Sequence, residues 1–593
     1  MGVDSSKLSE NDVDEAIKKF KGIEDILPPS PPTDNDDSDR QQSPDHDRDV
    51  ESESADNFHE GQGDSIEEGP IWMPKLPILS VSDDFITSKT WNSSVFELRE
   101  LLGAVQTGKF DGNSVHRYLR HYDKETLGLN LNAEIEGYPA MFYVIATKDI
   151  SIIRQWIKHG GNPNVTCEPY AIPLIAFCIF IGGNTMRQAT TTLATLLRFG
   201  ADPRVIPKAF YDPFCRDLPE DGPVQEELQD LQDENKRWCS EDVRSHLTKA
   251  LNLSQRYDLY RSSKAKPHSN REKDITARQD ADEVLGLHQL IVAQSIAIRW
   301  LKNKLLVGHG KTELARRFGD LMSLELHVVD CTLFEQGTEL FGPRPGFQSS
   351  EDGSSLNNFL WRNAGRRCIV FMDEFEKTSK NIHNTLLLLF QNGCYEDRRT
   401  HNLIDCSRTI WILATNQFDD SIHTFCGTNR HELFVSEDEQ AQDKVVATLC
   451  RELRTEFSGH FGAPLGGRIT EILPFLIFAR PEAAVIVHKV LMDLESTVRK
   501  RVRLTLNKED DVYVGNISIR IQNDARVCSL IAEYEYDKKT GARSIAQAVE
   551  RTIQDPLIGQ YLQIPENLDE NQPTAYFTIY VNVDKVVEVR LKP

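Results

Sequence analysis

The sequence predicts an α/β domain followed by a small α+β domain, preceded by an all-α repeat domain and an acidic N-terminal tail. Three observations predict this order. Short apolar strands alternate with helices from about residue 280, as in α/β folds. Helix–turn–helix units ending in Gly/Asn/Asp-Pro turns recur between 93 and 215. The residues before about 90 are polar, acidic and rich in Pro and Ser.

Composition limits the class of protein. At 593 residues, the chain is long enough for several domains. Its formal charge of −23 does not favour nucleic acid or an anionic membrane as a partner. The 11 cysteines include no C-x-x-C pair, which predicts reduced thiols and no zinc site. With no membrane-spanning run and no signal or transit peptide, we expect an intracellular, cytoplasmic protein.

Residues 1–92 form the predicted tail. They cannot bury enough apolar surface to offset the entropy lost on ordering, which predicts disorder. Ser30 and Ser43 precede prolines and can be phosphorylated, while Gly2 and Ser6 fit the loose pattern for N-myristoylation. A solvated spacer is the simpler interpretation of these features.

Residues 93–215 contain the predicted repeats. YVIATKDISIIRQWIKHGGNPN (143–164) is echoed by ATTTLATLLRFGADPR (189–204), with turns 40 residues apart, and HRYLRH (116–121) belongs to a weaker copy. The units resemble ankyrin repeats, whose period is about 33 residues, with a stretched second spacing. The resemblance implies a protein-binding surface on stacked helices. The alternative is a helical domain that only supports its neighbours.

Residues 216–276 are charged and predict a helical linker whose charges form a solvated face. Helices are expected in VQEELQDLQDENKRW (224–238) and SEDVRSHLTKALN (240–252). SSKAKPHSNREK (262–273) is expected to be a flexible hinge.

The α/β domain is predicted over residues 277–474. Its strands are expected at 324–330, 366–374 and 407–416, and their fully apolar cores suit the centre of a parallel sheet. Ligands bind at the carboxyl ends of such strands. The polar residues at those ends are therefore the candidates for a site.

Three candidates stand at strand ends. Asp373 can hold magnesium, chiefly through its water shell, and Glu374 can polarise an attacking water. Asn416 can position that water or touch a phosphate. Each of these residues, taken alone, is equally compatible with a helix cap or a turn.

A loop before the first of these strands supplies the remaining candidates. Backbone N–H groups at Gly308 and Gly310 can cradle phosphate, Lys311 can reach its oxygens, and Thr312 can ligate magnesium. Gly-Lys-Thr, Asp-Glu and Asn in this order predict a site for ATP and Mg²⁺. However, Leu305 stands where the loop pattern needs a glycine. If LLV (305–307) is instead the preceding strand, the loop is too short to wrap two phosphates.

These motifs resemble Clp-type AAA+ ATPases, specifically the second ATPase module of the ClpB disaggregase family. The order of GHGKTELA, ELFGPRPGF, IVFMDEFEKTSKNIHNTLLLLFQNG and ILATN carries the resemblance, which covers about 280–593. It implies a P-loop AAA+ core, a Clp-type C-terminal lid domain at 475–593, ATP hydrolysis and the remodelling of misfolded or unfolded protein clients. Ankyrin-like repeats before such a module are similar to mitochondrial ClpB-like disaggregases, which implies a mitochondrial location as the alternative.

The resemblance also implies roles for three further residues. Arg468 in GGRITEI matches the arginine finger, which reaches a neighbouring subunit's phosphate and implies a homo-oligomeric ring, usually a hexamer. Arg543 matches the second sensor, which contacts phosphate within its own subunit. Phe347 in GPRPGF stands in place of the pore-loop tyrosine that grips the substrate chain. Ordinary loop packing is the alternative for Phe347.

The departure at Leu305 leaves two functions open. Each missing backbone N–H removes a hydrogen bond worth about 1.5–3 kcal/mol, so the loss of about two lowers nucleotide affinity by a few powers of ten. One function is an ATP-driven chaperone whose ankyrin-like region docks clients or another protein partner. The other is an ankyrin scaffold with a nucleotide-binding but catalytically impaired AAA+ domain. A clamp-loader or helicase relative is disfavoured by the acidic charge.

Overall fold

The computed structural model describes residues 72–88, 95–168, 171–266, 324–334, 336–342, 352–397, 399–436, 438–503, 512–564, 568–569 and 571–592, with short stretches between 268 and 299. Among these residues, no helix is long and apolar enough to cross a membrane. The predicted disorder of residues 1–71 concerns a segment outside the described residues. Separate hydrophobic cores lie in the repeat region, around the parallel sheet and in the C-terminal domain.

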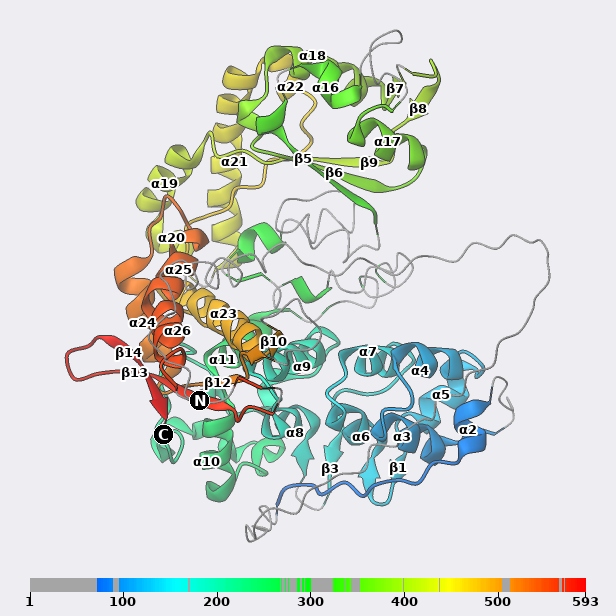
Figure 1. The fold of residues 1–593 in the computed structure, drawn as a ribbon, viewed down its shortest axis with the longest axis vertical. Coiled ribbons are helices and arrows are strands. Elements are labelled where there is room, and N and C mark those ends of the chain that lie inside the picture. The colour runs from blue at the N-terminus through cyan, green and yellow to red at the C-terminus, as the bar shows by residue number, and fades with distance from the viewer. Residues whose placement is uncertain are drawn as a thin grey trace, which may run out of the picture. The chain divides into compact units, whose positions relative to one another are not determined.

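The repeat region has two layers of helices (Figure 1). Helices α3, α6 and α8 pack in sequence in one layer, and α4, α7 and α9 pack in sequence in the other. The helices are α3 (Leu98–Gln106), α4 (Gly112–Leu119), α5 (Lys124–Asn130), α6 (Ala140–Ala146), α7 (Ile150–Lys158), α8 (Leu174–Ile181) and α9 (Met186–Arg198). Two short hairpins precede α6 and α8, formed by β1 (Glu134–Ile135) with β2 (Tyr138–Pro139) and by β3 (Thr166–Cys167) with β4 (Ile172–Pro173).

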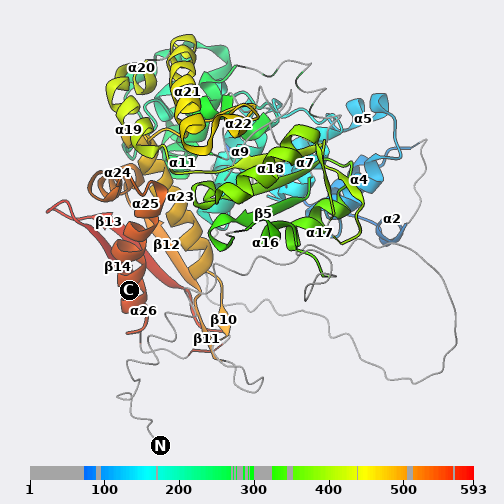
Figure 2. The same ribbon diagram turned by 90° about the horizontal axis from the view of Figure 1, so that it is seen from above.

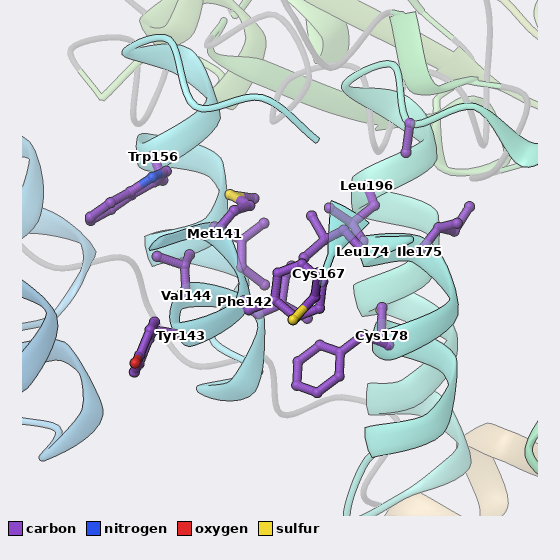
Figure 3. Packing of buried hydrophobic residues seen from close by; sticks show 14 of the residues in the cluster. Met141, Phe142, Tyr143, Val144, Trp156, Cys167, Leu174, Ile175, Cys178 and Leu196 are labelled. Carbon is purple, nitrogen blue, oxygen red and sulfur yellow. The ribbon is translucent and has the colours of Figure 1, made fainter. Parts of the chain in front are cut away.

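The inner helices are apolar because they are covered on all sides. Phe142 of α6 and Phe177 of α8 lie with ring centroids 4.8 Å apart. Trp156 of α7 is fully buried, and its indole N–H donates to the carbonyl of Leu131 (3.2 Å). Figure 3 shows how α6 and α8 contribute side chains to one continuous core.

A side-chain amide links each repeat turn to the next. Asn132 donates to the carbonyl of Gly160 (3.0 Å) and accepts from the N–H two residues later (2.7 Å). Asn164 makes the same two bonds one unit later. It donates to the carbonyl of Gly200 (2.9 Å) and accepts from the Asp202 N–H (2.7 Å). The first bridge spans 28 residues and the second spans 36. The stretched second unit that the sequence predicts is therefore present in the structure.

The repeat core begins before the predicted boundary at residue 93. Leu79 and Phe85, the latter on α2 (Asp83–Thr87), are buried, and Leu79 N–H donates to Gln106 Oε1 (2.9 Å). The assignment of residues 72–88 to a disordered tail was therefore wrong. Their few apolar side chains reach α3 and the helices beside it, which composition alone does not reveal.

The predicted linker is more buried than its charges suggest. Residues 224–238, expected to be one helix, form the short 3-10 turns η4 (Gln225–Glu227), η5 (Gln229–Gln232) and η6 (Glu234–Lys236). The helices α10 (Glu241–Ala250) and α11 (Leu253–Lys264) follow. Residues 253–259 of α11 are buried, including Arg256 and Asp258, so the expected solvated face was wrong there.

The central sheet of the α/β domain is parallel, in the order β5-β6-β9. Strands β5 (Leu326–Asp330), β6 (Cys368–Asp373) and β9 (Thr409–Leu413) occur where the sequence predicts strands. The first five residues of β6 are buried because side chains pack on both faces of the sheet. Val370 and Met372 share one core with Leu386, and Ile369 and Phe371 share another with Ile298 and Leu473. The other described elements of this domain are η8 (Cys331–Leu333), α16 (Gly337–Phe341), α17 (Ser355–Arg362), η9 (Phe375–Lys377), α18 (Lys380–Asn392), β7 (Cys394–Glu396), β8 (Leu403–Asp405), α19 (Asp419–Thr428), α20 (Arg430–Phe434), α21 (Glu439–Phe461) and α22 (Ala463–Gly466).

The C-terminal domain packs helices on a three-stranded sheet of order β12-β13-β14 (Figure 2). The predicted terminal strand pair forms, with β13 and β14 antiparallel. The elements are α23 (Arg480–Val498), β10 (Val502–Arg503), β11 (Tyr513–Val514), β12 (Ile517–Ile521), α24 (Asp524–Glu535), α25 (Ala542–Val549), a π-helical turn (Glu550–Gln554), α26 (Asp555–Tyr561), β13 (Ala575–Val581) and β14 (Val587–Lys592).

Asp258 on α11 is a buried acid. It is 1% exposed, and neither carboxylate oxygen has a hydrogen-bond partner among the described residues. Burial raises the pKa of Asp258 to about 7, and the charge of Lys489 opposes this shift only in part. The folded protein therefore binds this proton more tightly than the unfolded chain does.

We predict that replacing Asp258 by Asn removes a pH dependence of stability. The wild type should lose stability as pH rises from about 4 to 7, because the folded state holds the proton that the unfolded chain releases. At pH 8, the Asp258→Asn variant should be more stable by about 2 kcal/mol, measured by urea unfolding. Asp242→Asn on the exposed side of α10 is the control. An unchanged slope in Asp258→Asn would contradict the assignment.

Candidate functional site at the carboxyl edge of the sheet

The three parallel strands end at one edge of the sheet. Asp330 at the end of β5 lies opposite Asp373 at the end of β6 in the strand register. Beyond the strands, the Ala414 N–H donates to the carbonyl of Met372 (2.9 Å), and the Phe375 N–H donates to the carbonyl of Ala414 (2.8 Å). The segments after β6 and β9 therefore continue side by side past the sheet.

The turn after β6 holds two of the candidate residues. Phe375 is fully buried and belongs to the core beneath the sheet. To bring Phe375 back into that core, Glu374 takes a left-handed backbone conformation, with φ of 50°. The Glu374 N–H donates to Asp373 Oδ1 (3.1 Å), and both side chains are half-buried. The backbone thus holds the Asp373 carboxylate at the strand end and starts the Glu374 side chain beside it.

Asn416 lies at the same edge. It is exposed, and its N–H donates to Glu376 Oε2 (3.4 Å), a residue of the turn that follows Glu374. The fold therefore places Asp373, Glu374 and Asn416 at one edge of the sheet, and their chemical roles stay predictions.

The edge is acidic. Burial, with the charges of Asp330, Asp373 and Glu376, raises the pKa of the Cys331 thiol to about 12. Burial also raises the pKa of Asp419, with Glu376 adding to the shift and His423 opposing it. The described residues supply no ion-pair partner for Asp373 or Glu374. Such an edge requires added positive charge before it can accept a phosphate.

Magnesium fits this edge better than a tightly caged metal does. Within the described segments, no group of three or more His, Cys, Asp or Glu side chains could hold a metal ion. Mg²⁺ usually keeps several waters and binds one or two carboxylates together with the substrate phosphates. Asp373, half-buried and unpaired by any described cation, has the chemistry that this mode needs.

Arg468 lies away from this edge in its own chain. It is exposed, and its guanidinium donates to Gln391 Oε1 (2.6 Å) and to the carbonyl of Pro464 (2.8 Å). Gln391 is near the C-terminal end of α18, roughly 17 Å along the helix axis from its first residue, given 1.5 Å per residue. The turn that carries Glu374 precedes the opposite end of α18.

Arg543 is the second residue of α25 in the C-terminal domain, and its side chain is exposed. The described residues include no hydrogen-bond or ion-pair partner for its guanidinium. The remaining candidates, Gly308, Gly310, Lys311, Thr312 and Phe347, lie outside the described residues.

Sequence reasoning missed three acids at this edge, namely Asp330, Glu376 and Asp419. Asp330 could have been found, because it ends a predicted strand of the same parallel sheet. Glu376 and Asp419 are placed by the turns after β6 and β9, and no sequence pattern marks them.

Two family matches cover the region around this site. Residues 304–463 match the AAA domain (Cdc48 subfamily), and residues 479–570 match the C-terminal, D2-small domain of ClpB protein. The first match includes the strand-end residues Asp373, Glu374 and Asn416. The second includes Arg543.

Individual relatives agree with these matches. The chain is 27% identical over 252 residues to the chaperone protein ClpB of Chlamydia pneumoniae, covering 42% of this chain and 26% of the relative. It is 25% identical over 284 residues to the chaperone protein ClpB 1 of Nostoc sp., covering 47% and 28%. It is 26% identical over 258 residues to the ATP-dependent Clp protease ATP-binding subunit ClpC of Staphylococcus aureus (strain USA300), covering 42% and 28%.

Together, these similarities support a ClpB-type AAA+ ATPase module with its small C-terminal domain. The chain spans about a quarter of the length of these curated relatives. Both family matches begin after the repeat region.

We predict that the left-handed backbone conformation of Glu374 lowers the free energy of unfolding. Glycine adopts the left-handed conformation without the penalty that a side chain adds, so Glu374→Gly should raise the free energy of unfolding by about 1 kcal/mol. Glu376→Gly, two residues later in η9, is the matched control and should lower it by roughly 0.5–1 kcal/mol. Chemical denaturation of both variants measures the difference. A clear loss of stability in Glu374→Gly would mean that its side chain supports the fold.

Proposed function

We propose that this chain is an ATP-hydrolysing, ClpB-like chaperone that remodels misfolded or unfolded proteins. The observation that carries the proposal is the unpaired carboxylate pair Asp373–Glu374 beside Asn416, at the edge of a parallel sheet within the AAA domain match. The similar proteins support this proposal, because they include ClpB chaperones and the ATP-binding subunit of a Clp protease.

The proposed roles divide the chemistry among residues from two strand ends and the preceding loop. Gly308, Gly310 and Lys311 bind the phosphates of ATP, and Thr312 with Asp373 holds Mg²⁺. Bound Mg²⁺ would neutralise charge on the phosphates and on the acidic edge. Glu374 accepts a proton from the attacking water, and Asn416 orients that water.

The exposed position of Arg468 supports a role between subunits. Its guanidinium is held by Gln391 and Pro464 at the far end of α18 from Glu374, so it does not reach its own chain's strand edge. We propose that it completes the site of a neighbouring subunit in a homo-oligomeric ring. Arg543 would contact phosphate from the C-terminal domain of the same chain.

We propose that Phe347 and the repeat helices contact protein substrates. Phe347 would provide an aromatic contact for an unfolded polypeptide. The two layers of repeat helices would dock clients or another protein partner, as ankyrin-like stacks do.

A second function is favoured by one observation, the leucine at position 305. If the shortened loop binds nucleotide weakly, the chain would act as a repeat scaffold with a catalytically impaired AAA+ domain. The same strand-end residues would then surround a weakly filled site.

We predict that Glu374→Gln lowers the rate of ATP hydrolysis at least about a hundredfold, because the variant cannot accept the water's proton. Phosphate release by the purified full chain measures the rate. Glu452→Gln, an exposed carboxylate on α21, is the matched control and should keep the wild-type rate. A rate that Glu374→Gln does not lower would exclude the enzyme. Wild-type protein that binds ATP in calorimetry without turning it over would instead support the scaffold.

We predict that two inactive variants restore one another when mixed. Arg468→Ala subunits keep Glu374, and Glu374→Gln subunits keep Arg468, so about a quarter of the interfaces in a random ring contain both residues. ATP hydrolysis should therefore rise on mixing. Arg468→Ala mixed with the Arg468→Ala/Glu374→Gln double variant is the control and should stay inactive. No rise in the first mixture, despite assembly, would contradict a site shared between subunits.

A further inference from the structure

The last repeat differs from the one before it by an additional helical turn. Helix α7 begins at Ile150, directly after its N-cap Asp149. Helix α9 begins at Met186 and has 13 residues, compared with nine in α7. Because both helices end at equivalent Gly turns, the additional residues of α9 lie at its N-terminus. A regular repeat would not need them.

This additional turn contacts the C-terminal domain. The Met186 N–H donates to Glu495 Oε2 (2.8 Å), and Arg187 pairs with Asp493 (2.7 Å). One turn later, the Thr190 hydroxyl contacts Met492 Sδ (3.4 Å). The first turns of α9 thus contact residues 492–495 of α23.

Helix α11 packs against both α9 and α23. Asn252, its N-cap, also donates to the Thr190 hydroxyl on α9 (3.1 Å). Leu253 and Tyr257 belong to the same hydrophobic core as α23 and α24. The linker is therefore part of the C-terminal domain's core.

Polar groups strengthen this junction. Arg256 is 2% exposed and forms an ion pair with Asp524 at the start of α24. Asp524 also accepts from the Leu253 N–H (2.5 Å). Asp217, before α10, accepts from the N–H groups of residues 525 (3.0 Å) and 526 (3.1 Å), where α24 has free donors.

The sheet domain meets the repeats and the linker at few described residues. Its own hydrophobic clusters include no described residue from 79–264, while Val292 belongs to the cluster of Phe214 and Tyr257, and Gly286 lies against the Arg198 side chain. The linker's ion pair with this domain, Lys266 with Glu439 (3.3 Å), is exposed and contributes little. The C-terminal domain itself joins the sheet domain through residues 469–479, which form no helix or strand.

We propose that the repeat domain and the C-terminal small domain form one rigid body, joined through α9, α11, α23 and α24. The repeats then move with the small domain and not with the sheet. This arrangement goes beyond the proposed function, and it holds whether or not the chain hydrolyses ATP.

Hydrogen exchange of the full chain, read by mass spectrometry, tests the proposal. Amides that become exposed in the same opening event exchange with the same free energy of opening. A substitution within a rigid body therefore changes the exchange rates of all its amides by a common factor. Asp524→Asn should raise exchange in α9 and in α23–α24 by the same factor, at least about tenfold, and leave α17 and α18 unchanged. Asp555→Asn, an exposed residue on α26, is the matched control and should change none of these helices.

A milder variant keeps the test decisive if Asp524→Asn does not fold. Thr190→Val removes the hydroxyl that contacts Asn252 and Met492 from the repeat side. It should raise exchange in α23 as much as in α9, by at least about twofold. A rise confined to the domain that carries the substitution would overturn the rigid body. A failure of ATP hydrolysis in the same protein would count against the proposed function alone.

Discussion

Parallel pairing of β5, β6 and β9 determines what this molecule can do, because it brings three strand ends to a single edge. The core beneath the sheet requires Phe375 to turn inward, and Glu374 accepts an unfavourable backbone conformation for that reason. The packing of Phe375 consequently sets the backbone of Glu374, and so the point at the strand end from which its carboxylate extends.

A different kind of constraint joins the N-terminal and C-terminal parts of the chain. The buried pair Arg256–Asp524 links residues 268 positions apart. Apolar residues of similar size often stabilise a protein as well as a buried ion pair does, but they allow several packings. Three contacts at this junction require one position of the C-terminal helices α23 and α24 relative to α9 and α11. They are the ion pair, the capped start of α24 and the extra turn of α9.

Local patterns predicted much of this structure, and partners distant in sequence account for the rest. The strands ending at Asp330 and Asp373, and the strand before Asn416, follow from short apolar runs, and the stretched repeat follows from the spacing of its turns. The helix expected at 224–238 did not form, and its turns are bonded to residues outside the segment. Glu227 pairs with Arg216, and the Trp238 indole N–H donates to the carbonyl of Val205 (3.3 Å). The burial of Asp258 could not be foreseen, because the helix that covers it, α23, begins more than 200 residues later.

The amide bridges from Asn132 and Asn164 impose a direction on the repeat array. Each bridge joins only the turns of successive units, so another unit with the same asparagine could be inserted between them without altering either neighbour. After α9, no such insertion is tolerated, since the surface that a following unit would cover already belongs to α11 and α23. The C-terminal domain thus serves as the terminal cap of the array, which can gain units only ahead of α9.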